Sequence, residues 1–143
     1  MKKILVINGP SLNMLGIREP EIYGRTTYAE LETKIKTWAS ELGVEVKLFQ
    51  SNHEGAIIDE IQAAYGQCDG IIINPAGYTH TSVAIPDAIK AVGIPAVEVH
   101  ISDIENREEF RKISFIRPVC ITTVQGKGID GYREALELLT CSL

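Results

Sequence analysis

Glu98 and His100 are the pair of residues that points most directly to acid–base chemistry. They flank Val99 in a segment with the composition of a β-strand, so their side chains lie on the same face of that strand. A carboxylate beside an imidazole fixes the imidazole tautomer and raises its basicity, an arrangement common for a general acid. The pattern therefore favours a catalytic pair, with a hydrogen-bonded structural pair at a strand end as the alternative.

Tyr23 lies in a long connection, residues 8–25, between the first apolar run and the first helical pattern. Strand-to-helix connections in α/β domains usually have about 2–6 residues, and longer ones are often active-site lids or binding loops. A phenol with a pKa near 10 is only about 0.1% ionised at neutral pH, so a phenolate base needs a neighbouring cation. Arg18 and Arg25 are the candidates, although their spacing from Tyr23 does not force contact. The connection is either a lid around residues 16–25 or a surface loop in which Tyr23 packs for stability.

Strand and helix patterns alternate five times along the chain, as apolar runs and as apolar residues three and four apart. This alternation calls for a parallel sheet covered on both faces by right-handed crossovers. We expect an α/β protein with a flavodoxin-like, doubly wound sheet in the order 2-1-3-4-5. The predicted strands are residues 3–7, 44–49, 70–73, 94–99 and 119–124, and the predicted helices are residues 27–42, 56–65, a segment that ends near 92, a segment within 101–112, and 131–139.

The polar residues that follow these strands should meet at one edge of the sheet. In doubly wound folds, ligands bind beyond the carboxyl ends of the strands. The coincidence of these polar residues at one edge of the sheet favours a small-molecule site over a chance arrangement. The strands are followed by amide, carboxylate, hydroxyl and imidazole groups: Asn8, Ser51, Asn52, Asn74, Glu98 and His100.

His80 lies in the loop of residues 74–82, where it could bind substrate hydroxyls or cap the helix that follows. Together with His53 and His100 it could be proposed as a metal ligand. The spacing of the three histidines matches no zinc motif, so we expect no metal.

Ser102 follows His100 directly and begins one of two cap-then-acid spacings in residues 101–112. Backbone N–H groups at a helix start, together with a hydroxyl, bind carboxylates well, but a plain N-cap is the commoner use of such a serine. Arg107 and Arg111 follow among acidic residues at helical spacing, a pattern typical of a solvated face. The sequence leaves their orientation open.

Length and composition are those of one soluble globular domain, residues 1–143, which we expect to be a single catalytic domain in the cytoplasm. A net charge of −5 argues against a broad phosphate-binding surface, and thus against nucleic acid as a partner. No apolar run is long enough for a membrane span, and the first residues are too few for a signal peptide. The phosphate-binding motifs of nucleotide sites are absent. Three scattered cysteines favour neither disulfides nor a zinc site: Cys68, Cys120 and Cys141.

Three stretches in order, NGPSLNMLGIREPEIYG, NPAGYTHTS and EVHISDIENREEFR, resemble the type II 3-dehydroquinate dehydratase family. The resemblance spans nearly the whole chain. It implies a flavodoxin-like subunit in a homododecamer, a tetramer of trimers, without metal or organic cofactor. The implied reaction is an anti elimination of water from 3-dehydroquinate to 3-dehydroshikimate through an enolate. This is a step of the shikimate pathway, towards chorismate and the aromatic amino acids.

The resemblance also implies roles for the catalytic residues at matching positions. Tyr23 removes a proton next to the ketone, and Arg18 on the lid keeps that phenol ionised. Asn74 holds a water or the developing enolate oxygen. His100 protonates the leaving hydroxyl, and Glu98 orients His100.

The substrate carboxylate is implied to bind Ser102 and the backbone amides of Ile101 and Ser102. The resemblance implies that three further residues contact ring hydroxyls or hold the site together: His80, Arg107 and Arg111. It also implies that Asp87 reaches the site of a neighbouring subunit. The chain departs from the family pattern where Ser11 replaces the asparagine of NGPN and where Lys127 replaces the phenylalanine of G-F-G. We expect neither departure to abolish activity.

Two other hypotheses compete with an acid–base dehydratase. A Schiff-base route needs a buried lysine, and neither Lys90, on a predicted helix, nor Lys127, in a predicted turn, is well placed. A non-enzymatic flavodoxin-like binding module would carry flavin or an acidic phosphoryl-accepting cluster at the strand ends. Asn8, Asn74 and His100 stand there instead.

Overall fold

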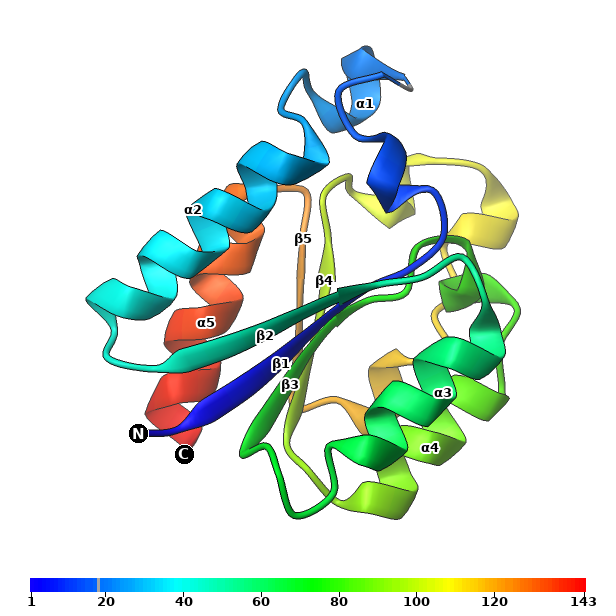
Figure 1. Ribbon diagram of the computed structural model, residues 1–143. Coiled ribbons are helices and arrows are strands. Elements are labelled where there is room, and N and C mark those ends of the chain that lie inside the picture. The colour runs from blue at the N-terminus through cyan, green and yellow to red at the C-terminus, as the bar shows by residue number, and fades with distance from the viewer. Residues whose placement is uncertain (18) are drawn as a thin grey trace.

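The computed structural model describes residues 1–17 and 19–143, leaving aside the side chains of Pro20 and Tyr23. Over these residues, five parallel strands form a single sheet in the order β2-β1-β3-β4-β5 (Figure 1). The predicted flavodoxin-like strand order is therefore confirmed. The strands are β1 (Lys3–Asn8), β2 (Glu45–Gln50), β3 (Gly70–Asn74), β4 (Ala96–His100) and β5 (Thr122–Gln125).

The central strands β1, β3 and β4 are buried along nearly their whole length. Strands at the centre of a parallel sheet are covered on both faces and are therefore apolar on both faces, as the sequence of β3 shows. β2 lies at the edge and is only partly buried, in agreement with its alternating apolar and charged residues. The polar residues that end the central strands are buried too, so each needs hydrogen-bond partners inside the protein: Asn8, Asn74, Glu98 and His100.

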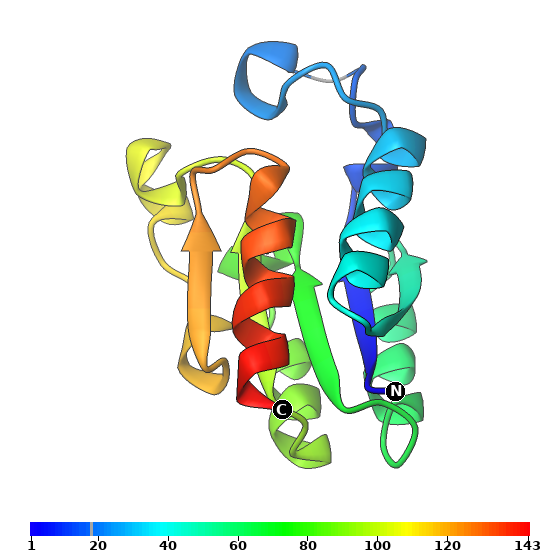
Figure 2. The ribbon, with the colours of Figure 1, turned by 90° about the vertical axis from the view of Figure 1, so that its left-hand side faces the viewer.

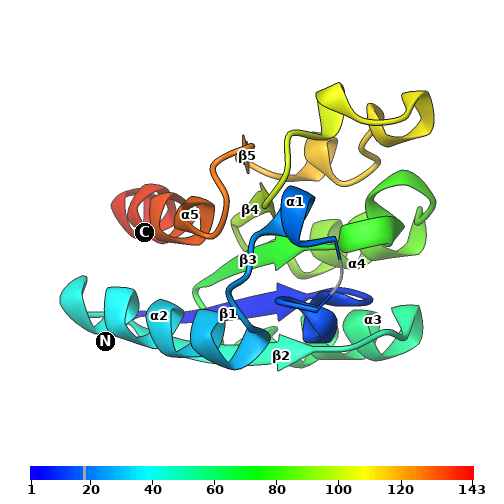
Figure 3. The ribbon, with the colours of Figure 1, turned by 90° about the horizontal axis from the view of Figure 1, so that it is seen from above.

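Helices cover both faces of the sheet, with α2 and α5 on one face and α3 and α4 on the other (Figures 1 and 3). Each pair packs a stripe of aliphatic residues against the strands, for example Leu31 and Leu136 on one face and Ile57 and Ile85 on the other. The helices are α1 (Pro20–Tyr23), α2 (Tyr28–Glu41), α3 (Glu54–Ala63), α4 (Ala84–Val92) and α5 (Asp130–Ser142).

Local sequence accounts for where these helices begin and end. Thr27 caps α2, because its Oγ1 accepts the backbone N–H of Glu30 at 3.2 Å. Gly43 follows the end of α2 with φ 71°, a left-handed conformation that glycine adopts without strain. Pro86 lies in the first turn of α4, where its missing N–H breaks no helical hydrogen bond.

The prediction of a regular helix within residues 101–112 was wrong. This segment forms two short 3-10 helices instead, η3 (Ile104–Asn106) and η4 (Glu109–Arg111). Asp103, not Ser102, is the cap: its carboxylate accepts the N–H of Glu105 at 3.0 Å and the side-chain amide of Asn106 at 2.7 Å. Such local bonds compete with helix propagation, and Arg107 leaves η3 with extended backbone angles.

The last strand, β5, begins at Thr122, three residues later than predicted. Pro118 lies in a further 3-10 turn, η5 (Arg117–Val119), which occupies the segment predicted to begin the strand. Two other 3-10 helices lie at the carboxyl edge of the sheet, η1 (Leu12–Met14) and η2 (Ala76–His80). In Figure 2, α1 stands above this edge, while both termini lie at the opposite end of the sheet. Among the described residues, no helix combines the length and apolar character that a bilayer span requires.

Candidate active site

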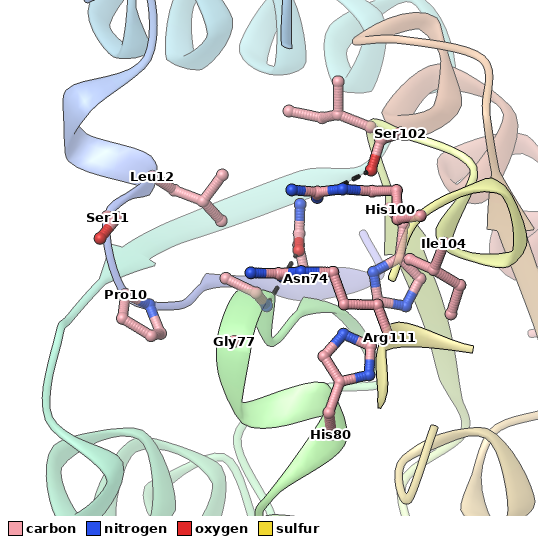
Figure 4. Close-up of a pocket in the computed structure, with 13 residues that line it drawn as sticks. Pro10, Ser11, Leu12, Asn74, Gly77, His80, His100, Ser102, Ile104 and Arg111 are labelled. Atoms are coloured by element: carbon pink, nitrogen blue, oxygen red, sulfur yellow. Dashed lines mark hydrogen bonds between the residues drawn. The ribbon is translucent and has the colours of Figure 1, made fainter. Parts of the chain in front are cut away.

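A pocket of about 240 Å³ opens at the carboxyl edge of the sheet, as predicted for this fold (Figure 4). Its volume suits a small metabolite better than a dinucleotide. The loops after β1, β3 and β4 form its lining. Seven residues proposed from the sequence lie in that lining: Asn74, His80, His100, Ile101, Ser102, Arg107 and Arg111. The sequence analysis missed the less polar part of the lining: Pro10, Leu12, Ala76, Gly77 and Ile104.

Gly9 lets the first two of these loops approach each other. Its N–H donates to the carbonyl of Asn74 at 2.8 Å, which continues the pairing of β1 with β3. A Cβ at this position would lie 2.5 Å from the carbonyl oxygen of Pro75, closer than two such atoms can come. The pocket therefore depends on a glycine at the end of β1.

Glu98 and His100 form the buried pair that the strand alternation predicted. His100 Nε2 lies 2.6 Å from Glu98 Oε2, and the two residues are 5% and 0% exposed. Because an ionised carboxylate can only accept, Nε2 carries the proton, and Nδ1 is the ring nitrogen left for the pocket. The tautomer is thus set for proton transfer at Nδ1.

Two hydroxyl groups outside β4 also contact Glu98, and Arg117 Nε lies 3.9 Å from its Oε1. Ser114 Oγ donates to Oε2 at 2.6 Å, and Thr123 Oγ1 donates to Oε1 at 2.8 Å. Burial by itself would raise the pKa of Glu98, but these bonds and the one from His100 outweigh it and hold the pKa below 4.5. Glu98 therefore stays ionised and keeps the imidazole in a single orientation.

The lowered pKa of Glu98 makes a prediction about stability in acid. Between its native pKa and its ordinary value of 4.5, the unfolded chain binds more protons at this site than the folded chain. The stabilisation is thus complete above that ordinary value and is lost as the pH falls through the native pKa. We expect the free energy of unfolding to fall with decreasing pH more steeply in the native protein than in Glu98→Gln. The difference approaches about 1.4 kcal/mol per pH unit for one proton.

Urea titrations at a series of pH values from neutral to strongly acid measure this slope. Glu137→Gln removes the same charge from an exposed ion pair with Arg133 on α5 and serves as the control. Equal slopes in the native protein and Glu98→Gln would contradict the assigned ionisation.

His80 is also fixed in one tautomer. Its Nδ1 lies 2.7 Å from the carbonyl oxygen of Ile113, which can only accept, so Nδ1 carries the proton and Nε2 is an acceptor. Burial lowers the pKa of His80, and the nearby Arg111 guanidinium adds to this, so the ring is neutral near pH 7. The ring of Phe110 meets it edge-on at 6.4 Å. A neutral Nε2 suits a hydroxyl of a bound ligand.

Two arginines supply positive charge to the pocket lining. Arg107, 14% exposed, donates from Nη1 to Ser102 Oγ at 3.4 Å and lies 3.8 Å from the carboxylate of Glu19. Arg111 pairs with Glu108 at 2.7 Å and stacks over Phe110 at 5.1 Å. Their charge pattern was typical of a solvated face and left their orientation open, and the irregular segment after β4 turns both towards the pocket. The positive charge of Arg107 and Arg111 favours an anionic ligand in this part of the pocket.

The turn between β5 and α5 holds the peptide groups of Ile101 and Ser102. The N–H groups of Gly128 and Gly126 donate to their carbonyl oxygens at 3.1 and 3.2 Å, respectively. Lys127, between these glycines, pairs with Glu134 at 2.7 Å and is not part of the pocket lining. The departure at Lys127 therefore leaves the pocket surface itself unchanged.

Ser11 and Ala76 line the pocket with positive φ angles of 69° and 52°, which are uncommon for residues other than glycine. Asparagine side chains hold both. Asn52 Oδ1 accepts the N–H of Ser11 at 2.9 Å, and Asn74 Oδ1 accepts the N–H of Ala76 at 3.2 Å. Backbone strain that the surrounding structure holds in place is common at binding sites. Here the bond from the Ser11 N–H to Asn52 anchors Ser11 through its backbone.

The lid is described only in part. Arg18 and the side chain of Tyr23 lie outside the described residues, so the pairing of these two remains a prediction. The ion pair between Glu19 and Arg107 connects the lid to the pocket. Asp87 is exposed in the first turn of α4 and is not part of the pocket lining.

Comparison with known proteins gives one consistent result. The family described as dehydroquinase class II matches residues 2–140. A 3-dehydroquinate dehydratase of Caldicellulosiruptor bescii is 59% identical over 97% of both chains. A catabolic 3-dehydroquinase of Aspergillus terreus is 54% identical over 95% of this chain and 90% of its own. The crystal structure of a type II dehydroquinase from Butyrivibrio crossotus is 53% identical, covers 96% of this chain and 97% of its own, and superposes with a TM-score of 0.95.

Proposed function

The chain belongs to the class II dehydroquinase family, and from this membership we infer that it is a 3-dehydroquinate dehydratase, a hydro-lyase. The observation that supports this function best is the buried Glu98–His100 pair at a pocket that also contains Asn74 and two arginines. These groups supply an oriented acid, an amide and a positive side for a carboxylate. The product, 3-dehydroshikimate, leads to chorismate and the aromatic amino acids.

The first step is removal of a proton from the carbon next to the ketone, with Tyr23 as the base. The phenolate takes the proton, and the electron pair of the C–H bond moves to form an enolate. Arg18 on the same lid favours the phenolate by its positive charge. The position of α1 above the carboxyl edge of the sheet (Figure 2) supports this role, because the pocket opens at the same edge.

The negative charge of the enolate is stabilised by Asn74. Its side chain is almost fully buried at the end of β3 and lines the pocket. An amide N–H that is fixed before the reaction stabilises a developing oxyanion without reorganisation, either directly or through a bound water.

The second step is loss of the hydroxyl group. The enolate electron pair re-forms the carbonyl and a new C=C bond while the C–O bond breaks, and His100 Nδ1 gives its proton to the departing oxygen, which leaves as water. Glu98 stabilises the imidazolium beforehand through Nε2. Base and acid belong to the lid and to β4, which suits an anti elimination.

The remaining lining residues bind the substrate. Ser102 and the N–H groups of Ile101 and Ser102 take the carboxylate, and Arg107 supports Ser102 through its hydrogen bond. His80 accepts a ring hydroxyl through Nε2. Arg111 contacts a second ring hydroxyl or holds the loop in place.

We also propose that the protein acts in the cytoplasm as a homododecamer built from trimers, with Asp87 contacting a neighbouring subunit's site. Large apolar residues between β4 and β5 remain exposed in the single chain, and such surfaces mark interfaces. Sedimentation velocity measures the assembly, and a monomer would contradict it. The exposed residues are Phe110, Ile113, Phe115 and Ile121.

An assay of the purified protein with 3-dehydroquinate tests the function. The conjugated enone of the product absorbs in the ultraviolet, so we expect rising absorbance, with or without a metal chelator. A folded protein that gives no absorbance change would contradict the proposed function. Borohydride trapping of substrate on a lysine would contradict the acid–base route. The structure gives no support to a lysine route, because Lys90 and Lys127 are not in the pocket lining.

A further inference from the structure

A chain of hydrogen bonds connects pocket residue Asn74 to the interior of the protein. Asn74 Nδ2 donates to the hydroxyl of Tyr132 at 2.9 Å, and that hydroxyl donates to Asn8 Oδ1 at 2.6 Å. Asn8 Nδ2 lies 3.4 Å from the hydroxyl of Tyr28, the first residue of α2. Asn74, Tyr132 and Asn8 are 3%, 1% and 0% exposed. The chain of hydrogen bonds thus runs from the end of β3 to α5, on to the end of β1, and then to the start of α2.

The backbone N–H of Ala76 determines which atom donates in each hydrogen bond of this chain. The N–H of Ala76 can only donate, so the atom of Asn74 that faces it at 3.2 Å is the oxygen. The amide nitrogen then faces Tyr132, whose hydroxyl must accept there and donate to Asn8. One N–H of Asn74 remains for the pocket.

We propose that Tyr132, together with Asn8, is a positioning residue that holds the amide of Asn74 with its N–H available to the enolate oxygen. This inference rests on the proposed function, because it assigns the amide a role in that reaction. Without the tyrosine hydroxyl, the N–H of Ala76 is the one hydrogen-bond partner among the described residues that opposes a half-turn of the amide. A turned amide presents its oxygen, which repels an enolate.

The location of Tyr132 suits such a role. It lies in the first turn of α5 and packs in the same core cluster as Leu136, so its ring cannot move without disturbing that cluster. Burial raises the pKa of Tyr132 well above its ordinary value, so the hydroxyl keeps its proton and can donate to Asn8. Neither residue is part of the pocket lining, so both act through Asn74.

A double-mutant cycle tests the proposal. We expect Tyr132→Phe to lower kcat about 10- to 100-fold, with KM changed less than about threefold, because the amide serves the transition state. In an Asn74→Ala background, the same substitution should change kcat less than about twofold. Equal factors in the two backgrounds, or unchanged kcat in the native background, would overturn the proposal.

Leu139→Ala is the matched control. Leu139 lies on the same helix and in the same core cluster, but it packs against Gly70 at the other end of β3. The Leu139→Ala substitution should lower the unfolding temperature without lowering the kcat of the folded enzyme. If Tyr132→Phe fails to fold, Asn8→Ser removes the next acceptor in the chain, and we expect kcat to fall there as well.

A spectroscopic readout separates this proposal from the proposed function. The side-chain amide signals of Asn74 in a ¹⁵N NMR spectrum are identified by their absence in Asn74→Ala. Tyr132→Phe should shift them, and Leu139→Ala should not. Unmoved signals in Tyr132→Phe would overturn the positioning role even in a protein without dehydratase activity, whereas a lack of turnover by the native protein contradicts only the proposed function.

Discussion

Tyr23→Phe is expected to lower kcat by about 10³- to 10⁴-fold while the protein remains folded. The substitution removes one oxygen atom and with it the proposed base for proton removal from carbon. General bases contribute about 10²- to 10⁴-fold to turnover, and the upper part of this range applies because the proton next to a ketone is weakly acidic. The proposed pairing with Arg18 adds to the effect, since each unit of lowered phenol pKa corresponds to about 1.4 kcal/mol.

Steady-state turnover of 3-dehydroquinate measures this loss. Tyr65→Phe is the matched control, because Tyr65 is 70% exposed and lies outside the pocket lining. Exchange of the substrate's proton with deuterated solvent, followed by NMR, should be lost together with elimination. Near-normal turnover of Tyr23→Phe would eliminate this residue as the base.

His100→Ala is expected to lower kcat about 10²- to 10⁴-fold, by a different route. The variant retains the base and the amide of Asn74, so enolate formation should continue while loss of the hydroxyl is blocked. We therefore expect exchange of the substrate's proton to persist and elimination to be lost. The variant also leaves the buried carboxylate of Glu98 with fewer partners, so its unfolding temperature should fall.

His53→Ala controls for loss of an imidazole, since His53 is exposed at the start of α3 and lies outside the pocket lining. Loss of both exchange and elimination in folded His100→Ala would contradict its assignment as the acid alone. Together, the two substitutions assign proton removal and hydroxyl loss to different sides of the pocket.

The periodicity of the sequence predicted the sheet and its order because each strand carries its own signal. The alternation of Glu98, Val99 and His100 also predicted that the carboxylate and the imidazole share a face. Thr123 could have been found in the same way, since the predicted order puts β5 beside β4, where Thr123 pairs in register with Glu98. The substrate came from the resemblance to a family.

Other features had no local signal. Asp103 and Ser102 are equally good caps by type, and only the folded loop shows that Asp103 bonds the following residues. The inward direction of Arg107 depends on the irregular backbone after β4. Tyr132 resembles any apolar position of α5, because its partners belong to strands far away in the sequence.

The bond between Tyr132 and Asn8 spans 124 positions of the chain. During synthesis, the amino-terminal strands leave the ribosome long before α5 exists, so the amide of Asn74 first lacks its partner. The hydrogen-bond chain through Tyr132 can form only after α5 has been translated. A nascent or prematurely terminated chain that stops before α5 therefore lacks the bond from Asn74 to Tyr132.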